Sequence, residues 1–169
     1  SIYVNQWPTA DKTLYTLYNL RPEGFKGLLF EVAPREDMHF VDLFAHNELT
    51  PAQRGGKWYI PAQVDAFNSF ELGTNNESTV SAIAQLPCLL KVDLKSDELT
   101  FSGTKGNKIL IWGGIPSYEK EPKEYSTAQQ TIRLLEAFPG YEGKFIVQLF
   151  DGATLLDERV IDVLPGTPR

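Results

Sequence analysis

Between residues 13 and 114, short apolar runs are separated by breaks made of proline, glycine and asparagine. The runs are about five to eight residues long and rich in β-branched and aromatic residues, and turn residues return roughly every ten positions, which is typical of strands joined by loops. Trp58 and Trp112 stand beside two of these breaks. The pattern therefore predicts an all-β scaffold, and loops on such scaffolds usually carry the binding function.

The first runs predict a small antiparallel meander. Residues 13–19 and 27–33 are rich in strand formers, and the turn residues of 21–24 separate them, so we expect an antiparallel pair. Residues 39–45 follow as a third strand. The run 58–61 contains a proline, which would confine it to a sheet edge or a loop.

The later runs predict further strands and one well-defined hairpin. Residues 64–72 do not distinguish a bent strand from a helical turn. Strands are expected at residues 79–84, 88–94, 98–103, 108–112, 130–136, 144–150 and 155–163, with a turn at Ser96 and Asp97. The run 144–150 is apolar at nearly every position, which favours a central strand covered on both faces. Asp151 and Gly152 then predict the turn of a hairpin.

The chain length suits one domain or two very small ones. At 169 residues, we predict a single domain over residues 1–169, folded as an antiparallel β-sandwich that is immunoglobulin- or jelly-roll-like. Residues 104–107 are polar, contain a glycine and lie between strands. They are the candidate position for a subdivision of the chain.

Charge and composition exclude several classes of partner. Sixteen basic and 22 acidic side chains give a net charge of −6, so nucleic acid phosphates would be repelled. Neutral sugars meet no such penalty. No apolar run approaches the roughly 20 residues that cross a bilayer, so no membrane partner is expected. The lone Cys88 excludes an internal disulfide, and its apolar surroundings predict a small buried side chain.

Aromatic side chains are the candidate ligand-binding residues. Flat rings bind the C–H faces of sugars through apolar contact and the ring quadrupole. The full ring set is Trp7, Trp58, Tyr59, Trp112, Tyr118, Tyr125 and Tyr141. Burial in the core is the competing interpretation for each ring. The predicted ligand-binding residues are Trp58, Tyr59, Trp112, Tyr118 and Tyr125, of which the last two lie in a polar loop, 116–127, of a length that is often functional.

No pattern of residues predicts a catalytic centre or a metal site. The carboxylates considered for glycoside hydrolysis are Glu31, Asp42, Glu71, Asp93 and Asp97, and we expect them to be exposed. His39 and His46 bracket Asp42, but on a regular strand they would face opposite sides of the sheet. We therefore predict no metal site and no cofactor, although oxygen ligands from residues 75–77 or from Asp151 could hold a structural calcium ion.

The order of the runs 13–19, 27–30 and 39–44 resembles the β-sandwich regions appended to glycosidase-like barrel proteins. The resemblance covers roughly the first third of the chain. It lies in the order and composition of the strand-like runs and not in an exact motif, so it assigns no catalytic residue. It implies an accessory, non-catalytic module, such as a carbohydrate-binding module, with a polysaccharide or oligosaccharide as partner.

Two alternatives to this function remain open. The chain could instead be a structural or interaction domain that packs against a catalytic domain of the same parent protein. It could also be a small glycoside hydrolase that uses Asp42 and a second carboxylate. The chain begins without methionine, and we expect a processed or excised part of a larger protein that is extracellular or secreted.

Overall fold

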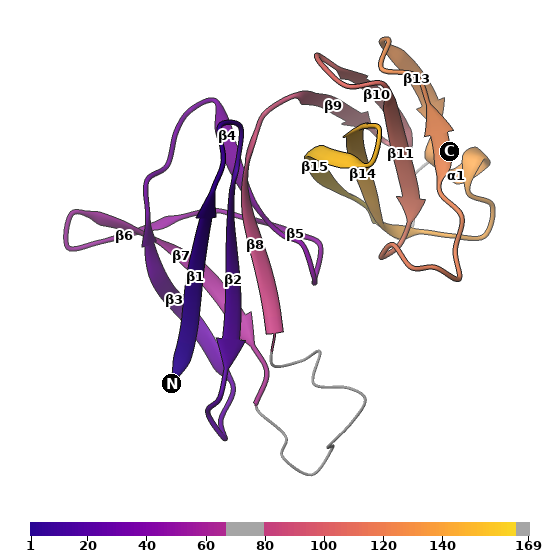
Figure 1. Cartoon of the computed structure of the whole chain (residues 1–169). Coiled ribbons are helices and arrows are strands. Elements are labelled where there is room, and N and C mark those ends of the chain that lie inside the picture. Colours follow the sequence, from indigo (N-terminus) through magenta and orange to yellow (C-terminus); the bar gives the residue numbers. More distant parts are fainter. Residues whose placement is uncertain (67–79, 165–169) are drawn as a thin grey trace. The chain divides into compact units, whose positions relative to one another are not determined.

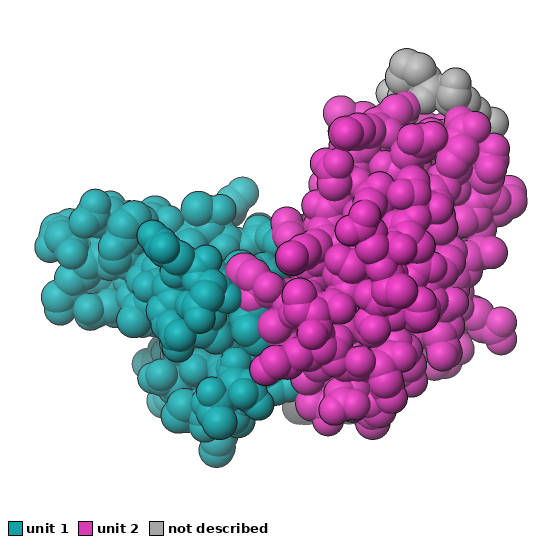
Figure 2. Space-filling view, turned by 90° about the horizontal axis from the view of Figure 1, so that it is seen from above, with its two compact units in different colours: residues 1–87 teal, residues 88–169 magenta. Residues whose placement is uncertain are grey.

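The computed structural model describes residues 1–66 and 80–164, and this part of the chain is all-β apart from one helical turn. The all-β, antiparallel part of the predicted fold is therefore confirmed. The chain divides into two compact units, Ser1–Pro87 and Cys88–Arg169 (Figures 1 and 2). Residues 104–107 lie inside the second unit, between two strands. Whether the two units act as one domain stays a prediction.

The first unit contains two antiparallel sheets. Its strands are β1 (Ile2–Pro8), β2 (Thr13–Asn19), β3 (Phe25–Val32), β4 (Met38–Asp42), β5 (Asn47–Leu49), β6 (Ala52–Arg54), β7 (Lys57–Val64) and β8 (Val80–Pro87). One sheet has the order β1-β2-β8-β4-β5 and the other the order β3-β7-β6 (Figure 1). The predicted run 64–72 lies mostly outside the described residues.

The predicted meander is wrong, because its strands belong to different sheets. β2 pairs with β1 and β8, whereas β3 pairs with β7. β4 pairs with β8 and β5. The fully buried side chain of Asn19 donates to the carbonyl oxygens of Glu23 and Asp65 and accepts from the backbone N–H of Arg21. These bonds stabilise the connection between β2 of one sheet and β3 of the other. Turn residues alone do not distinguish such a connection from a hairpin.

The prediction that proline would confine residues 58–61 to an edge or a loop is also wrong. Pro61 lies in β7, between β3 and β6. The pairing with β6 ends at Tyr59, so no β6 residue faces Pro61, and β3 has an irregularity between Leu28 and Phe30 at this level. Proline is tolerated at this position because its missing N–H donor interrupts no regular series of hydrogen bonds between strands.

The core of the first unit draws apolar side chains from both of its sheets. The buried members are Tyr15, Leu17, Val32, Phe40, Ile60, Ala62, Val64 and Ile83. Because strand side chains alternate with a period of two, the inward position of Tyr15 and Leu17 turns Thr16 and Tyr18 to the opposite face of the sheet. This alternation positions the surface described below.

The second unit contains two further antiparallel sheets and a helical turn. Its elements are β9 (Leu90–Lys95), β10 (Glu98–Gly103), β11 (Lys108–Gly113), β12 (Lys123–Tyr125), β13 (Gln130–Arg133), α1 (Leu134–Ala137), β14 (Gly143–Asp151) and β15 (Thr154–Val163). The sheet orders are β13-β10-β9 and β12-β11-β14-β15. Of the predicted strand 130–136, only the first four residues are β, and the helical turn follows.

Several local predictions for the second unit are confirmed. β14 lies between β11 and β15 and is buried on both faces, as its apolar run indicated. The hairpin follows Asp151, which pairs with Thr154, and Gly152 has a left-handed φ of 60°. A turn at Ser96 and Asp97 joins β9 to β10.

The prediction of a buried Cys88 is wrong, because this side chain is exposed. Cys88 lies between β8 and β9, at the boundary of the two units, and the core of the second unit begins beyond it at Leu90. Within residues 1–66 and 80–164, no helix has the length and apolar character needed to cross a bilayer.

Candidate functional site

The ribbon formed by β1 and β2 exposes three aromatic rings on one face. Tyr3 pairs directly with Tyr18, and Trp7 follows four residues later on β1, so the alternation of side chains places all three rings on the same face. Their exposed fractions are 53% for Tyr3, 57% for Trp7 and 39% for Tyr18. We call Tyr3, Trp7 and Tyr18 the ring face.

Polar side chains lie between the rings of this face. Asn5 pairs with Thr16 at the position midway between Tyr3 and Trp7. The indole N–H of Trp7 donates to the hydroxyl oxygen of Thr16 at 3.1 Å, which fixes the orientation of the indole. At the usual strand rise, four residues separate Tyr3 from Trp7 by about 13 Å. The ring face thus combines apolar rings with hydrogen-bonding groups over an extended strip.

On this face of the five-stranded sheet, the ring face lies on the β1–β2 ribbon. The cross-strand row that contains Trp7 continues through Leu14 and Ala84 to Val41. Ala84 and Val41 are buried, so the exposed part of this row ends near β2. Sequence reasoning included Trp7 in the ring set but missed Tyr3 and Tyr18. The alternation of Tyr3, Asn5 and Trp7 was the signal that could have found them.

The structure distributes the five predicted ring residues over both units. In the first unit, Trp58 and Tyr59 are neighbours on β7, so their side chains point to opposite faces of that sheet. Trp58 is 42% exposed, whereas Tyr59 is half-buried. These two residues cannot form one flat platform together.

The other three predicted residues belong to the second unit. The half-buried Trp112 donates its indole N–H to the side-chain oxygen of the buried Gln148 at 2.9 Å. Tyr125 packs edge-on against Phe101, with ring centroids 5.2 Å apart. Tyr118 is 98% exposed. Trp112 and Tyr125 therefore have structural contacts, while Tyr118 stands in solvent, and the role of all five residues in ligand binding stays a prediction.

Partly buried phenols give the protein a defined response to high pH. Burial raises the pKa of Tyr15 and of Tyr125 above the ordinary value of 10.0. Above that value the unfolded chain loses these protons first, so we expect the free energy of unfolding to be unaffected below pH 10.0 and to fall as pH rises through the folded pKa. Urea unfolding followed by circular dichroism on both sides of pH 10.0 measures this loss. Tyr15→Phe should reduce it, with Tyr118→Phe as the exposed control, and an undiminished loss in Tyr15→Phe would contradict the assignment.

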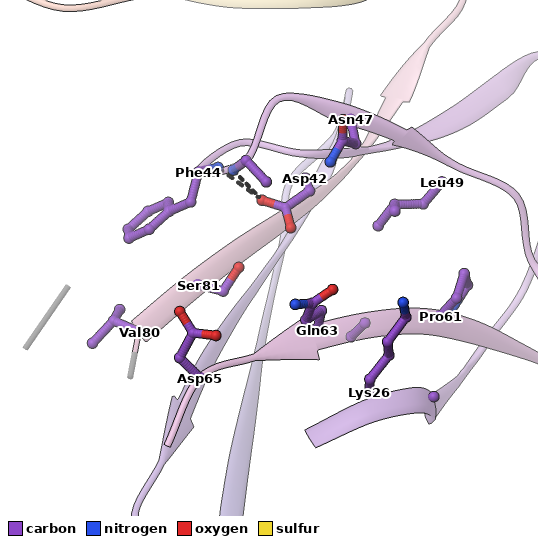
Figure 3. Close-up of a pocket in the computed structure, with 13 residues that line it drawn as sticks. Lys26, Asp42, Phe44, Asn47, Leu49, Pro61, Gln63, Asp65, Val80 and Ser81 are labelled. Carbon is purple, nitrogen blue, oxygen red and sulfur yellow. Dashed lines mark hydrogen bonds between the residues drawn. The ribbon is translucent and has the colours of Figure 1, made fainter. Parts of the chain in front are cut away.

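A second surface of the first unit is a cleft of about 510 Å³. Its polar side chains include Lys26, Asp42, Gln63, Asp65 and Ser81, which come from β3, β4, β7, β8 and the residue after β7. Figure 3 shows their polar ends pointing toward a common space. We call this the Asp42 cleft.

Asp42 orders one wall of the cleft. One carboxylate oxygen accepts hydrogen bonds from the backbone N–H groups of Phe44 and Ala45, at 2.8 and 2.9 Å. These bonds hold the turn between β4 and β5. The other oxygen points into the cleft, between Ser81 and Gln63 (Figure 3). One oxygen of Asp42 thus stabilises the turn, while the other faces the cleft.

The expectation that the candidate carboxylates are exposed is wrong for two of them. Asp42 is 7% exposed because it lies under its own turn. Asp97 is buried beside Arg133, at 3.5 Å from its guanidinium. Glu31 forms an exposed ion pair with Lys57, and Glu71 lies outside the described residues.

The two histidines do not share the regular strand that the sequence argument assumed. His39 lies in β4, with its ring nitrogen 3.2 Å from the Glu48 carboxylate, whereas His46 lies in the following turn with a positive φ of 52°. Among the residues that the structure describes, no group of three or more His, Cys, Asp or Glu side chains is arranged to hold a metal ion. Residues 75–77, one of the suggested calcium positions, are outside the description, so structural calcium stays a prediction.

No protein family model matches the chain, and no curated protein or solved structure matches it either. The ring face and the Asp42 cleft are the two surfaces of the first unit that bear on function. The ring face offers exposed aromatic area with hydrogen-bonding groups between the rings. The Asp42 cleft offers a half-open site in which polar side chains lie beside apolar walls.

Proposed function

We propose that the chain is a non-catalytic carbohydrate-binding module that holds a polysaccharide against the ring face. The observation that carries this proposal is the strand register, which brings Tyr3, Trp7 and Tyr18 together on one exposed face. The site thus differs from the five ring residues that the sequence predicted. It rests on the same chemistry, because exposed rings bind the apolar faces of sugars.

The ring face suits an extended neutral polymer for two reasons. Its rings are spaced along a straight strand, so they can contact successive sugars of a chain rather than a single sugar. The hydrogen bond from Trp7 to Thr16 orients the indole in advance, which lowers the entropy lost on binding. Asn5, which lies on the same face, can hydrogen-bond the ring hydroxyls of a sugar.

We also infer that each unit is a β-sandwich. In the first unit, the core combines Tyr15 and Ile83 of one sheet with Val32 and Ile60 of the other. In the second unit, the core likewise combines residues of β9 and β10 with residues of β11, β14 and β15. Two sheets that share a core are the defining feature of sandwich packing.

Retention of the 169-residue chain on immobilised polysaccharides tests the proposed function. We expect binding to at least one of cellulose, xylan, mixed-linkage glucan, chitin or starch. Trp7→Ala should weaken that binding by about tenfold or more, since Trp and Tyr dominate binding energies where they are central to a contact. Tyr18→Ala should weaken it in the same direction. Affinity electrophoresis and calorimetry measure both effects.

Trp58→Ala is the matched control, because it removes an exposed tryptophan from the other sheet of the same unit. Its binding should equal that of the unaltered chain. If Trp58→Ala loses binding and Trp7→Ala does not, the site lies on β7 and not on the ring face. No retention on any polysaccharide, with an unchanged circular dichroism spectrum, would contradict carbohydrate binding and favour a domain whose rings anchor another protein. Release of reducing sugar that disappears in Asp42→Asn would favour the hydrolase alternative.

A further inference from the structure

The Asp42 cleft contains polar groups that the described residues leave without hydrogen-bond partners. The second carboxylate oxygen of Asp42 and the hydroxyl of Ser81 belong to side chains that are only 7% and 6% exposed. Both groups point into the cleft (Figure 3). The cleft therefore offers hydrogen-bonding positions that a ligand entering it can reach.

Three further side chains face the same space from the opposite wall. The ammonium group of Lys26, the amide of Gln63 and the carboxylate of Asp65 line the cleft, and none of the described residues pairs with them. With Asp42 and Ser81, the cleft therefore contains two carboxylates that accept hydrogen bonds and one ammonium group that donates them. Its amide and its hydroxyl can do both.

The mixture of charges selects the class of ligand. A cationic ligand that fills the cleft would meet the ammonium group of Lys26, and an anionic ligand would meet the carboxylates of Asp42 and Asp65. A neutral ligand with several hydroxyl groups avoids both conflicts. Its hydroxyls can donate to the carboxylates and accept from the lysine at the same time.

The remaining lining provides apolar contact. Leu49 and Pro61 line the cleft beside the polar groups, and so does the exposed Phe44. Pockets for small molecules typically combine such apolar walls with a few converging polar groups, and a volume of this size holds a small ligand. The C–H faces of a sugar would contact these walls while its hydroxyls reach the polar groups.

We propose that the Asp42 cleft binds a neutral polyhydroxylated ligand of one or two sugar residues. The ligand donates hydroxyl hydrogen bonds to Asp42 and Asp65 and accepts one from Lys26. This site is separate from the ring face, because Ser81 pairs with the core residue Leu17 and so lies on the inner face of the sheet whose outer face carries Tyr18. The inference does not depend on the ring face binding a polysaccharide.

Titration of the ¹⁵N-labelled 169-residue chain with small probes tests this site. The probes are the neutral sugars glucose, galactose, mannose, xylose, cellobiose and maltose, with butylammonium chloride and sodium acetate as charged probes. The backbone amides of Phe44 and Ala45 donate to Asp42, so their resonances report on the cleft. We expect at least one neutral sugar to shift them saturably, and neither charged probe to do so.

Two variants localise the effect to the cleft. Asp65→Asn and Lys26→Gln should each weaken the sugar affinity by about tenfold, the effect of losing one charged hydrogen-bonding partner. Neither side chain supports the backbone, so both variants should fold. Asp93→Asn removes one exposed carboxylate from the second unit and should bind normally.

Three results would overturn this inference. The first is a saturable shift with a charged probe and not with any neutral sugar. The second is the absence of any shift at Phe44 and Ala45 at sugar concentrations well above the millimolar range. The third is full affinity in both Asp65→Asn and Lys26→Gln. Trp7→Ala should leave these shifts unchanged, so failure of the ring face and failure of the Asp42 cleft are distinguished.

Discussion

Replacing Phe145 with alanine is expected to lower the free energy of unfolding by about 3–5 kcal/mol, the usual cost of deleting a buried aromatic ring. Phe145 is fully buried on β14, the strand between β11 and β15. Its ring meets Phe138 and Tyr141 edge-on, with centroids 5.3 and 5.1 Å apart. Alanine would leave a cavity among these rings and remove their favourable edge contacts. Urea unfolding followed by circular dichroism measures the loss.

Phe44→Ala is the control for this substitution. It removes the same side-chain atoms from an exposed position in the first unit, so it should change the free energy of unfolding by well under the Phe145 value. If both variants lost similar free energy, or if Phe145→Ala lost less than about 1 kcal/mol, the ring cluster would not be central to the second unit.

Replacing Asp157 with alanine is expected to cost about 2–5 kcal/mol, because it leaves several buried N–H donors without an acceptor. Asp157 is fully buried on β15. One of its oxygens accepts from the backbone N–H groups of Leu89 and Leu90, at 2.9 and 2.8 Å. The other accepts from the N–H of Glu158 at 2.8 Å. This carboxylate therefore ties the start of β9 to the last strand, where the chain enters the second unit.

Hydrogen exchange at the amides of Leu89 and Leu90 gives a local measurement of the same effect. We expect exchange at both amides to be faster in Asp157→Ala, in addition to the global loss of stability. Asp162→Ala is the matched control, because Asp162 lies on the same strand but is exposed. Unchanged protection of Leu89 and Leu90 in Asp157→Ala would show that other contacts hold this part of the chain.

The contacts of Trp112 and Tyr125 make the second unit the weaker candidate for the binding surface. Two of its predicted ring residues have structural contacts, since Tyr125 packs on Phe101 and Trp112 is bonded to Gln148. Gln148 in turn donates to the fully buried Glu158 at 2.7 Å. Trp112 is half-buried, so it offers a ligand less ring area than Trp7, which is 57% exposed.

Local sequence signals predicted the strands well but not their partners. Turn residues and apolar runs located β10, β11 and β14, because a strand's turns and its burial are recorded in neighbouring residues. The pairing of β2 with β8 joins Leu17 to Ser81, which are far apart in the sequence. No local pattern records such a pairing, so the predicted pairing of β2 with β3 was wrong.

The candidate site, too, was predicted only as far as local sequence signals reach. The sequence predicted that aromatic rings bind the ligand, and Trp7 was among the candidate rings. Whether a given ring is buried depends, however, on which strand covers it. The same holds for Asp42, which the turn after β4 buries and directs into a cleft. Sequence reasoning expected that carboxylate to be exposed, since most carboxylates are.

Turn chemistry and the period of neighbouring side chains are local properties, and they were enough to predict the all-β character, the positions of most turns, the central strand β14 and the hairpin after Asp151. The shared exposed face of Tyr3, Trp7 and Tyr18, and the cleft that Asp42 and Ser81 line with Asp65, become visible only in the folded chain. The physical reason is that strand register and sheet packing are set by contacts between residues that lie far apart along the chain.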